Sequence, residues 1–519
     1  MAKGRGVAAA CIYGSRVAGY ARPDSDVDIL IVLENYPYVV KYVYFSESGL
    51  KVSALAVDRR ALERDAKTGF LGEFVVGRLL HVYEPIISAV FFEAIERIYK
   101  RRVILEEVQD IVGSAGVLST EIIFPLEFVV FSKIRRRISL YPGAAFSYYK
   151  TYTVDNRNLE FALKGYRRAL ADIIAIDKEL FAPRHDDLLQ ISHKRVLLKR
   201  GNTRLKLTKR LQEFSSYLVH TYAGRKIMYL MVNEAESKIR RSAGETAELP
   251  NFMACPRGAY WRLPEGRLII DGRNWPGDLG YSIARKRRLG NINSRTMLYE
   301  LDSGKVVVKE LAWLKAVKWA ALNLWTAPVK RFRVDALFRL GSEYRAIRYI
   351  RSLGLLTPFI EAVVLDRKLI VTRYVEGRTL AGVIKDYIRG SDDAGLLREA
   401  GAQIAKIHNA GSSLGNVKPK NVIASGSVLY FTDVEQFVFQ GGDPAWDLAQ
   451  FVSWSLKGTR NTGMAAAVAR EFLQGYARIA GTANIIRLAK SRRYIESFYP
   501  VLAPSVVRAI KEEIKEIAK

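Results

Sequence analysis

The chain has 519 residues, enough for roughly three domains, and 49% of them are hydrophobic, so each domain can bury a core. Lysine and arginine outnumber aspartate and glutamate by 81 to 53, and the formal charge of +28 favours polyanionic partners over cationic ones. Two cysteines, Cys11 and Cys255, exclude a disulfide framework and predict a reducing, cytoplasmic environment. Because no apolar run approaches the roughly 18 residues of a membrane helix, we expect no membrane partner.

The N-terminal segment contains the most specific motif of the chain. A strand is predicted over residues 8–13, and it leads into Gly14 and Ser15 at the start of a short helix. Backbone amides at such a helix start point outward and can hold a phosphate. Gly14 allows a phosphate to approach the backbone closely, and the Ser15 hydroxyl adds a donor. The segment is therefore a candidate phosphate site.

A pair of carboxylates follows this candidate phosphate site. Asp26 and Asp28 stand two residues apart at the start of a second predicted strand, residues 26–33, so their side chains project from the same face. Two carboxylates on one face suit a pair of magnesium ions in phosphoryl chemistry. The sequence therefore predicts metal-assisted chemistry on a phosphate-containing substrate.

Gly-Ser followed after ten residues by Asp-x-Asp resembles the signature of the minimal nucleotidyltransferases of the DNA polymerase β superfamily. The resemblance implies that residues 1–84 form a small mixed-sheet domain. It also implies that Asp26 and Asp28 are catalytic metal ligands. Gly14 and Ser15 would then bind the triphosphate of ATP, or of another nucleoside triphosphate, together with Mg²⁺.

This family usually supplies a third carboxylate from a later strand. The candidate strand covers residues 50–58, and the expected position falls near Ser53, which cannot ligate a metal as a carboxylate does. Asp58 is close in sequence, but strand alternation points it to the face opposite Ser53. Two alternatives follow: the third carboxylate is missing, or Asp58 supplies it through a bend.

Residues 85–245 are predicted to form a basic helical middle region. Helical periodicity covers residues 85–109, 158–180 and 214–241. In the superfamily named above, a helical region after the catalytic sheet often forms the wall that holds the acceptor substrate. The resemblance therefore implies that role here.

Two segments of the middle region combine basic residues with patterns suited to RNA. Arg135-Arg-Arg137 lies near tyrosines that could stack bases, namely Tyr141, Tyr148, Tyr149 and Tyr152. Residues 193–210 alternate basic and apolar residues about Gly201-Asn202, which predicts a hairpin with a positive face. The alternative for both segments is an ordinary charged surface, with the tyrosines packed inward.

Residues 246–519 form the last predicted part of the chain. An irregular stretch precedes a predicted hairpin over residues 299–311, in which Lys309 follows three valines. Glu343 lies on a predicted helix further on.

The stretch from His408 to Asp447 carries the second set of motifs. It reads Leu-Gly-Asn-Val-Lys-Pro-Lys-Asn over residues 414–421, Thr-Asp-Val-Glu over residues 432–435, and Asp-Pro-Ala-Trp-Asp over residues 443–447. The order and spacing resemble the active-site half of protein-kinase-like phosphotransferases, with the RIO kinases, the small kinase of the archaeal KEOPS complex and the aminoglycoside phosphotransferases nearest. The resemblance implies two lobes, at residues 282–375 and 376–519.

The kinase resemblance also implies roles for individual residues. Lys309 with its partner Glu343, and Lys418, would bind the ATP phosphates. Asn421 and Asp433 would hold Mg²⁺, and Asp447 would anchor the catalytic loop. The positions of the phosphate loop and of the hinge that holds adenine fall on residues 290–296, which contain a single glycine, and 370–377.

The position of the catalytic base departs from the kinase pattern. It falls on Asn416, and an amide cannot take a proton from a hydroxyl group. Glu435 is one candidate for a replacement base, and a loose transition state that needs little help from a base is the other explanation. We therefore expect the kinase-like part to bind ATP more surely than to hydrolyse it.

These motifs predict an α+β multidomain protein and leave three functions open. The first is transfer of a nucleotidyl group to an RNA or protein acceptor, while the kinase-like part binds Mg-ATP. The second is an atypical kinase or ATPase, and the third is a catalytically degraded, nucleotide-sensing scaffold on RNA. Antibiotic modification ranks last, because a chain of charge +28 repels cationic aminoglycosides.

Overall fold

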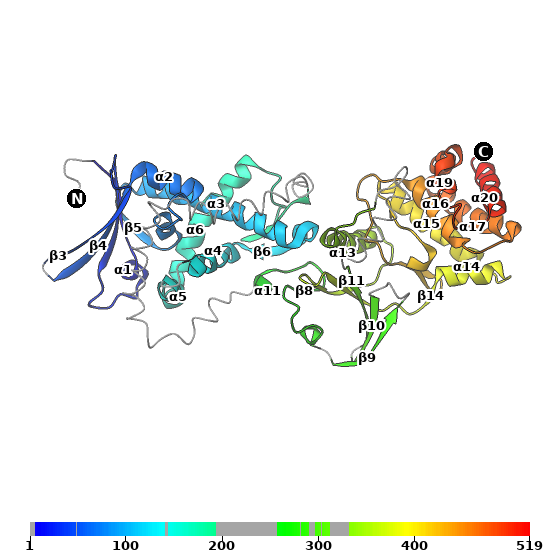
Figure 1. Ribbon diagram of the computed structural model, residues 1–519, viewed down its shortest axis with the longest axis horizontal. Helices are drawn as coiled ribbons and strands as arrows, with labels where there is room; N and C mark the ends of the chain where they lie inside the picture. The colour runs from blue at the N-terminus through cyan, green and yellow to red at the C-terminus, as the bar shows by residue number, and fades with distance from the viewer. Residues whose placement is uncertain are drawn as a thin grey trace. The chain divides into compact units, whose positions relative to one another are not determined.

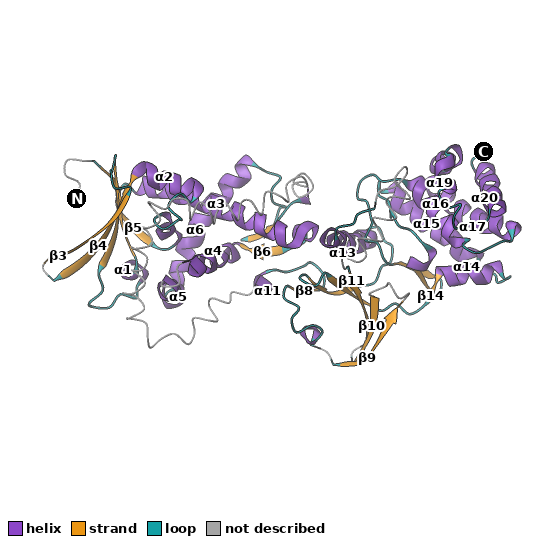
Figure 2. Ribbon diagram, in the orientation of Figure 1, coloured by secondary structure: helices purple, strands orange, loops and turns teal. Residues whose placement is uncertain are grey.

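The computed structural model describes residues 6–47, 49–140, 144–193, 257–280, 282–289, 296–302, 304–311 and 332–519 (Figure 1). The chain forms two compact units. Unit 1 comprises Met1–Ser114 and Ile122–Arg262, and unit 2 comprises Ala115–Glu121 and Leu263–Lys519. The predicted domains 1–84 and 85–245 thus fall in unit 1, apart from residues 115–121, and the predicted boundary at residue 246 lies outside the described residues. Both units combine helices and strands, which confirms the α+β class (Figure 2).

Unit 1 contains a five-stranded mixed sheet with the strand order β3-β4-β2-β1-β5. The strands are β1 (Val7–Tyr13), β2 (Val27–Leu33), β3 (Val40–Glu47), β4 (Leu50–Asp58) and β5 (Tyr83–Ile87). Strands β2 and β4 run parallel, and the other neighbours are antiparallel. Six consecutive residues of β4 are buried, as expected for a strand covered on both faces. The strands predicted at residues 8–13, 26–33 and 50–58 are confirmed.

Helices make up most of the remainder of unit 1. They are α1 (Ser15–Ala18), α2 (Arg59–Thr68), η1 (Val76–Leu80), α3 (Ala89–Ala115), α4 (Leu126–Leu140), α5 (Ala145–Val154), α6 (Asn156–Ile176) and α11 (Arg257–Tyr260), and a small sheet pairs β6 (Ile123–Pro125) with β7 (Leu188–Gln190). The helix predicted from residue 85 begins only at Ala89, because Tyr83–Ile87 pairs with β1. Helix α6 confirms the prediction at residues 158–180. The helix predicted at residues 214–241, and the hairpin predicted beyond His193, lie outside the described residues.

A buried ion network joins α3 and α4 to the turn that follows α2. Glu73 pairs with Lys133 of α4 at 2.8 Å and with Arg102 of α3 at 2.9 Å, and Arg137 lies 3.6 Å away. Burial by itself would raise the pKa of Glu73, but the three cations outweigh it and lower the pKa to about 2. The network therefore stabilises unit 1 only while Glu73 is ionised.

The arginines that the sequence placed near tyrosines are engaged inside unit 1. Arg137 is buried and donates to the Tyr148 hydroxyl at 3.0 Å, and Arg136 pairs with Glu107. Tyr148 and Tyr152 are themselves buried. Arg137, Tyr148 and Tyr152 therefore pack inward and do not face solvent as a platform for RNA bases. Arg135, Arg136 and Tyr149 are half-buried, and Tyr141 lies outside the described residues.

The N-terminal part of unit 2 is a six-stranded sheet with the order β8-β12-β13-β11-β10-β9. Its strands are β8 (Arg267–Ile269), β9 (Ile283–Leu289), β10 (Thr296–Leu301), β11 (Gly304–Glu310), β12 (Ile360–Val364) and β13 (Leu369–Arg373). Strands β10 and β11 form the predicted hairpin, since they pair antiparallel from Thr296 with Lys309 to Leu301 with Gly304. Helix α13 (Ala336–Ser352) follows in the chain, and the Asp335 side chain caps its start.

The C-terminal part of unit 2 is mainly helical. It contains α14 (Leu380–Ile388), α15 (Ala394–Asn409), η5 (Pro419–Asn421), α16 (Pro444–Ser455), α17 (Thr462–Ala480), α18 (Ala483–Lys490), α19 (Arg492–Glu496) and α20 (Pro504–Ile517), with a small sheet of β14 (Arg378–Thr379), β15 (Val422–Ser425) and β16 (Val428–Phe431). Helices α15 and α17 pack closely where Gly401 and Gly475 leave no room for a Cβ atom. The hairpin of β15 and β16 connects the candidate catalytic loop to the candidate metal ligand Asp433. None of the described helices combines the length and apolar character needed to cross a membrane.

Unit 2 also includes a short segment from elsewhere in the sequence. Residues 115–121, which contain the 3₁₀ helix η2 (Gly116–Thr120), pack against α13. A Cβ atom on Gly341 of α13 would lie 2.5 Å from the Leu118 backbone nitrogen, so the two backbones approach closely. Glu121 pairs with Arg348 of α13 at 2.5 Å. We name residues 115–121 the α13 strap. The remaining short helix, η4 (Gly277–Leu279), lies between β8 and β9.

Candidate nucleotide sites of the two units

The candidate site of unit 1 lies in one row of residues across the sheet. Asp28 of β2 pairs with Tyr13 of β1 on one side and with Ser53 of β4 on the other, and Ser53 pairs with Tyr44 of β3. Side chains of directly paired residues share a face, so Asp28 and Ser53 point in the same direction. Asp26 is two residues before Asp28, immediately ahead of β2, and both carboxylates are half-buried. The two predicted acids are therefore together at the N-terminal end of β2.

Gly14 brings the end of β1 against one of these acids. Its φ of 83° and ψ of −157° are accessible to glycine but not to other residues. A Cβ atom at this position would collide with the Asp28 carboxylate. Ser15 begins α1 directly after this turn. Gly14 and Ser15 thus lie beside Asp26 and Asp28, from which ten residues separate them in the sequence. We name these four residues the cradle. It fits a metal-bound phosphate group.

The third carboxylate position is occupied by Ser53, which is only 4% exposed. Asp58 does not reach the site. It pairs with Leu33 at the other end of β2, where its carboxylate accepts hydrogen bonds from the backbone nitrogens of Ala61 and Tyr36 and caps α2. The alternative in which Asp58 supplies the third carboxylate is therefore wrong. Among the described residues, no group of three or more acids, histidines or cysteines is arranged to hold a metal ion.

A cation that the sequence did not single out lies near this cradle. Arg78 of η1 donates to the Tyr42 hydroxyl at 3.1 Å, and its guanidinium group lies 5.4 Å from the centroid of the Tyr13 ring. Tyr13 is the residue immediately before Gly14. The position of Arg78 depends on the packing of a 3₁₀ helix against the sheet, and no motif in the sequence marks it.

The candidate site of unit 2 centres on a buried lysine with three carboxylates. Lys309 of β11 donates to both carboxylate oxygens of Glu343, at 2.9 and 2.8 Å, and also contacts Asp433 and, at 3.3 Å, Glu435. Burial by itself would lower the pKa of Lys309, but the three carboxylates outweigh it and raise the pKa well above its usual range. The predicted pairing of Lys309 with Glu343 is thus present in the structure.

The third carboxylate of this cluster has a second cationic partner. Glu435 lies 3.3 Å from Arg339 of α13, and both side chains are almost fully buried. Burial raises the pKa of Glu343 above its usual range, although Lys309 acts in the opposite direction. Three carboxylates thus face two cations. This surplus of negative charge is chemically suited to a divalent cation near Asp433.

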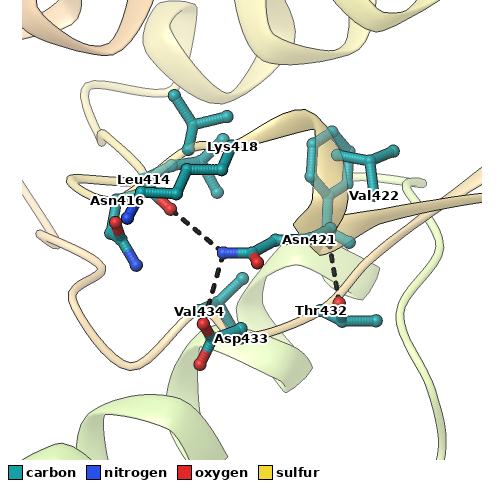
Figure 3. Close-up of a pocket in the computed structure, with 10 residues that line it drawn as sticks. Leu414, Asn416, Lys418, Asn421, Val422, Thr432, Asp433 and Val434 are labelled. Carbon is teal, nitrogen blue, oxygen red and sulfur yellow. Dashed lines mark hydrogen bonds between the residues drawn. The ribbon is translucent and has the colours of Figure 1, made fainter. Parts of the chain in front are cut away.

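The two predicted metal ligands of unit 2 lie next to each other. Asn421 donates through Nδ2 to Asp433 Oδ2 at 3.3 Å, and Asp433 has a φ of 56°, which is rare for a residue other than glycine. Both residues line a small pocket, which Figure 3 shows together with Asn416 and Lys418. An amide oxygen and a carboxylate are hard oxygen ligands of the kind that Mg²⁺ prefers, so the residues fit the metal.

The loop that contains residue 416 is fixed by a buried acid. Asp447 accepts hydrogen bonds from the backbone nitrogens of Leu414, at 2.7 Å, and Gly415, at 2.9 Å. His408 approaches the same carboxylate at 3.2 Å through Nε2. Asp447 is completely buried at the start of α16, so it holds the loop backbone from below and does not face the pocket.

The structure locates both Asn416, at the base position, and Glu435, the candidate for a replacement base. Asn416 lines the pocket and is 6% exposed. Glu435 does not line the pocket, because its carboxylate is directed to Arg339 and Lys309. The suggestion that Glu435 acts as the base is therefore wrong. Lys418 lies with its ammonium group 4.6 Å from the centroid of the Trp454 ring, a partner that sequence patterns did not indicate. The predicted phosphate loop, apart from Thr296, lies outside the described residues.

One comparison with known proteins concerns the N-terminal part of the chain. The family model described as a nucleotidyltransferase domain matches residues 2–111. Residues 2–111 thus carry a nucleotidyltransferase domain. It includes the whole cradle of Gly14, Ser15, Asp26 and Asp28, together with Arg78.

The C-terminal half is kinase-like. The chain is 30% identical over 110 residues to a KEOPS complex subunit Bud32 from Pyrococcus abyssi, covering 20% of this chain and 50% of that protein. It is 29% identical over 178 residues to a probable serine/threonine-protein kinase BUD32 homolog from Archaeoglobus fulgidus, covering 32% of this chain and 85% of that protein. The first match therefore spans only half of the relative's length.

Solved structures of two kinases also align with the chain. One is a choline/ethanolamine kinase family protein from Mesorhizobium loti, with 15% identity, 47% of this chain and 89% of that chain covered, and a TM-score of 0.29. The other is LicA in complex with AMP, with 16% identity, 46% of this chain and 92% of that chain covered, and a TM-score of 0.27.

Proposed function

We propose that the nucleotidyltransferase domain moves a nucleotidyl group from a nucleoside triphosphate to an RNA or protein acceptor. The observation that carries the proposal is the cradle in which Gly14 places the end of β1 against the Asp28 carboxylate. Nucleotide-related transferase chemistry is consistent with the family of this domain. An RNA acceptor suits the charge of +28, because phosphate contacts dominate nucleic-acid binding.

Each residue of the cradle has a defined part in this proposal. Asp26 and Asp28 would hold Mg²⁺, which neutralises charge on the phosphates and aligns the reacting oxygens. Gly14 admits the phosphate close to the backbone, and the Ser15 hydroxyl donates to it. Arg78, held by the Tyr42 hydroxyl, adds positive charge beside the cradle. The acceptor hydroxyl loses its proton to solvent, its oxygen forms a bond to the α-phosphorus, and pyrophosphate leaves with the electron pair of the broken bond.

Transfer of α-labelled nucleotide tests this proposal. The full-length chain is incubated with each α-labelled nucleoside triphosphate and Mg²⁺, with and without RNA. We expect the Asp28→Asn variant to lose at least about 100-fold in rate, because metal activation contributes several kcal/mol to such reactions. The exposed neighbour Asp24 provides the matched control, since Asp24→Asn removes the same charge without touching the cradle. Equal rates for wild type and Asp28→Asn would refute the proposal.

A second function is proposed for unit 2, namely binding of Mg-ATP by the kinase-like domain. It rests on the contact of Lys309 with Glu343 and Asp433, and on the adjacency of Asn421 to Asp433. Equilibrium dialysis with ATP and Mg²⁺ tests it in the full-length chain. We expect Asp433→Asn to remove the Mg²⁺ dependence of binding, whereas the exposed Asp392→Asn, also in unit 2, leaves binding unchanged. Binding of ATP without transfer of either the α- or the γ-label would instead support the nucleotide-sensing scaffold.

A further inference from the structure

The row of residues that contains Asp28 continues beyond Ser53 to β3, the edge strand of the sheet of unit 1 (Figure 1). Tyr44 of β3 pairs with Ser53 of β4, which pairs with Asp28 of β2. Directly paired residues share a face, so the Tyr44 side chain projects from the same face as the Asp28 carboxylate. At about 4.8 Å per strand, the backbones of Tyr44 and Asp28 are about 10 Å apart. This distance is short enough for a single nucleotide to contact both side chains.

Tyr44 is an accessible aromatic side chain on a fixed support. It is 64% exposed and stacks on Tyr42, with the ring centroids 5.7 Å apart and an interplanar angle of 13°. The Arg78 guanidinium group donates to the Tyr42 hydroxyl at 3.1 Å, and the Phe74 ring packs against the Tyr42 ring in a T-shaped arrangement. A planar ligand stacks best on a ring that is both accessible and fixed. Tyr44 is therefore suited to a nucleobase.

A cation lies beside Tyr44 on the same face. Lys51 of β4 pairs with Ser46 of β3, and each is two residues from a member of the pair of Tyr44 and Ser53. Strand alternation thus places Lys51 on the face of Tyr44, as its diagonal neighbour at about 7 to 8 Å. Lys51 is exposed. A cation for a backbone phosphate beside a ring for a base is the combination that binds single-stranded nucleic acid. We name Tyr44 and Lys51 the edge platform.

The direction of the proposed transfer places the acceptor on the side of the edge platform. Gly14 and Ser15, the proposed triphosphate ligands, follow β1, which lies on one side of β2, whereas β4 and β3 lie on the other side. In a displacement at phosphorus the attacking and leaving oxygens lie roughly in line. Pyrophosphate that leaves on the side of β1 therefore requires a hydroxyl that attacks from the side of β4 and β3.

We propose that the acceptor is the 3′ end of a single-stranded RNA, whose terminal base stacks on Tyr44 while Lys51 binds a phosphate of its backbone. The terminal ribose hydroxyl then lies toward the cradle. It loses its proton to solvent, its oxygen forms a bond to the α-phosphorus, and pyrophosphate leaves with the electron pair of the broken bond. The inference rests on the nucleotidyl transfer proposed for unit 1, and it selects RNA over protein as the acceptor.

Two measurements on the full-length chain separate the edge platform from the transfer reaction. Fluorescence anisotropy, without nucleotide, measures binding to a labelled single-stranded RNA and to the same RNA whose 3′-terminal nucleotide lacks its base. Initial rates with α-labelled nucleoside triphosphate and Mg²⁺ give separate KM values for the RNA and for the triphosphate. Comparison of the two RNAs isolates the terminal base from the general attraction of RNA to a chain of charge +28.

The wild-type chain should bind the RNA with the intact end about 10-fold more tightly than the RNA with the abasic end, because a stacked base contributes an effect of this size. Tyr44→Ala should abolish this preference and raise the KM of the RNA about 10-fold, with no change in the KM of the triphosphate. Tyr44→Phe keeps the ring and should behave as the wild type. Lys51→Ala should weaken binding of both RNAs equally and reduce the salt dependence of log K by about 0.7, the release of one counterion.

Matched controls lie on the opposite face of β3. Phe45 and Lys41 are exposed, and strand alternation directs both away from the face of Tyr44. Phe45→Ala removes an exposed aromatic ring and Lys41→Ala an exposed positive charge from the same strand. Both variants should keep the preference for the intact RNA end and the two KM values.

Three results would overturn the proposal. A preference for the intact end that persists in Tyr44→Ala would show that the terminal base stacks elsewhere. A higher KM for the triphosphate alone in Tyr44→Ala would assign the ring to the base of the donor nucleotide. Labelling of a protein without RNA, to the same extent in Tyr44→Ala, would assign a protein acceptor. If no acceptor is labelled, the nucleotidyl transfer itself is refuted, and anisotropy still decides whether Tyr44 binds the RNA end.

Discussion

Asp28 and Ser53 stand directly opposite each other on the parallel strands β2 and β4. The nearly buried Ser53 hydroxyl thus occupies the position at which the nucleotidyltransferase resemblance leads us to expect a third carboxylate. We predict that Ser53→Asp raises the rate of nucleotidyl transfer by about 10-fold or more, because a third carboxylate strengthens the metal site. It should lower stability in the absence of Mg²⁺, since three carboxylates then repel one another. Rates with α-labelled nucleotide and melting temperatures with and without Mg²⁺ check both effects, and a Ser53→Asn variant with the same rate would contradict the first.

Two glycines near the cradle provide a matched pair of substitutions. Gly14 and Gly19 both have positive φ values, of 83° and 84°, but only Gly14 approaches another group. Gly14→Ala should displace the Asp28 carboxylate and reduce transfer by at least about 100-fold. Gly19→Ala meets no atom within 4 Å, so we expect it to cost about 1 kcal/mol of backbone strain and to retain activity. Loss of activity in both variants to the same extent would show that backbone strain alone accounts for the effect.

Glu435 is predicted to stabilise unit 2 and not to act in proton transfer. Replacing it with glutamine leaves the buried Arg339 without its carboxylate partner, and loss of one member of a buried ion pair costs about 3 kcal/mol. We therefore expect Glu435→Gln to lower the free energy of unfolding of unit 2 by this amount, as measured by hydrogen exchange in α13. The pH profile of any γ-phosphoryl transfer should keep its shape. A profile that loses its acidic limb, the fall in rate at low pH, in the variant would restore Glu435 as a base.

The Glu73 network predicts a specific acid sensitivity of unit 1. Since the folded pKa of Glu73 is about 2 and the ordinary value is 4.5, its contribution is fully present above about pH 5 and is lost as the pH falls from about 4.5 to 2. The total amounts to on the order of 3 kcal/mol. Urea unfolding between pH 5 and pH 3 should show a smaller pH dependence in Glu73→Gln than in wild type. Equal slopes would mean that Lys133, Arg102 and Arg137 do not hold the ionised carboxylate.

The contact between α13 and its strap predicts an effect at a distance from the pocket. A Cβ atom on Gly341 would meet the strap backbone at 2.5 Å, so Gly341→Ala should shift α13 and with it Glu343, the partner of Lys309. We expect ATP affinity to fall by about 10-fold. Gly382→Ala in α14 is the control, because its nearest atom would lie 3.6 Å away, and it should be neutral or stabilise by about 0.5 kcal/mol. Unchanged ATP affinity in Gly341→Ala would show that the strap does not position Glu343.

Local patterns predicted that some residues of each candidate site lie together. Strand alternation predicts that Asp26 and Asp28 lie together, and the structure places Asp28 on β2 and Asp26 directly before it. Lys309 and Glu343 meet as the kinase resemblance implies. Residues with a fixed spacing within one strand or loop keep their relation wherever that element packs. This is why the acids of β2 and the loop ending at Asn421 were identified without knowledge of the fold.

The errors arose where tertiary packing decides the outcome. Asp58 was a candidate ligand by proximity in sequence, but the end of β4 is also the start of α2, and the carboxylate caps that helix. Glu435 is a candidate base by position, but Arg339, a buried residue 96 positions away in the sequence, lies 3.3 Å from its carboxylate and pairs with it. Residues 85–87, for which helical periodicity predicts a helix, instead form part of β5 and pair with β1. Glu435 and residues 85–87 bond to partners that are distant in the sequence, and local patterns do not reveal such partners.

The α13 strap has a consequence for how this protein could arise and be divided. Residues 115–121 belong to unit 2 although unit 1 contributes chain on both sides of them. The kinase-like unit is therefore discontinuous in the gene, and a single cut that separates the two units also removes part of one of them. Gene fission at one point would leave the backbone of α13 at Gly341 uncovered. Because the two units are interleaved in the sequence, separating them in the gene is disfavoured. An isolated kinase-like fragment would need residues 115–121 attached to it through a linker.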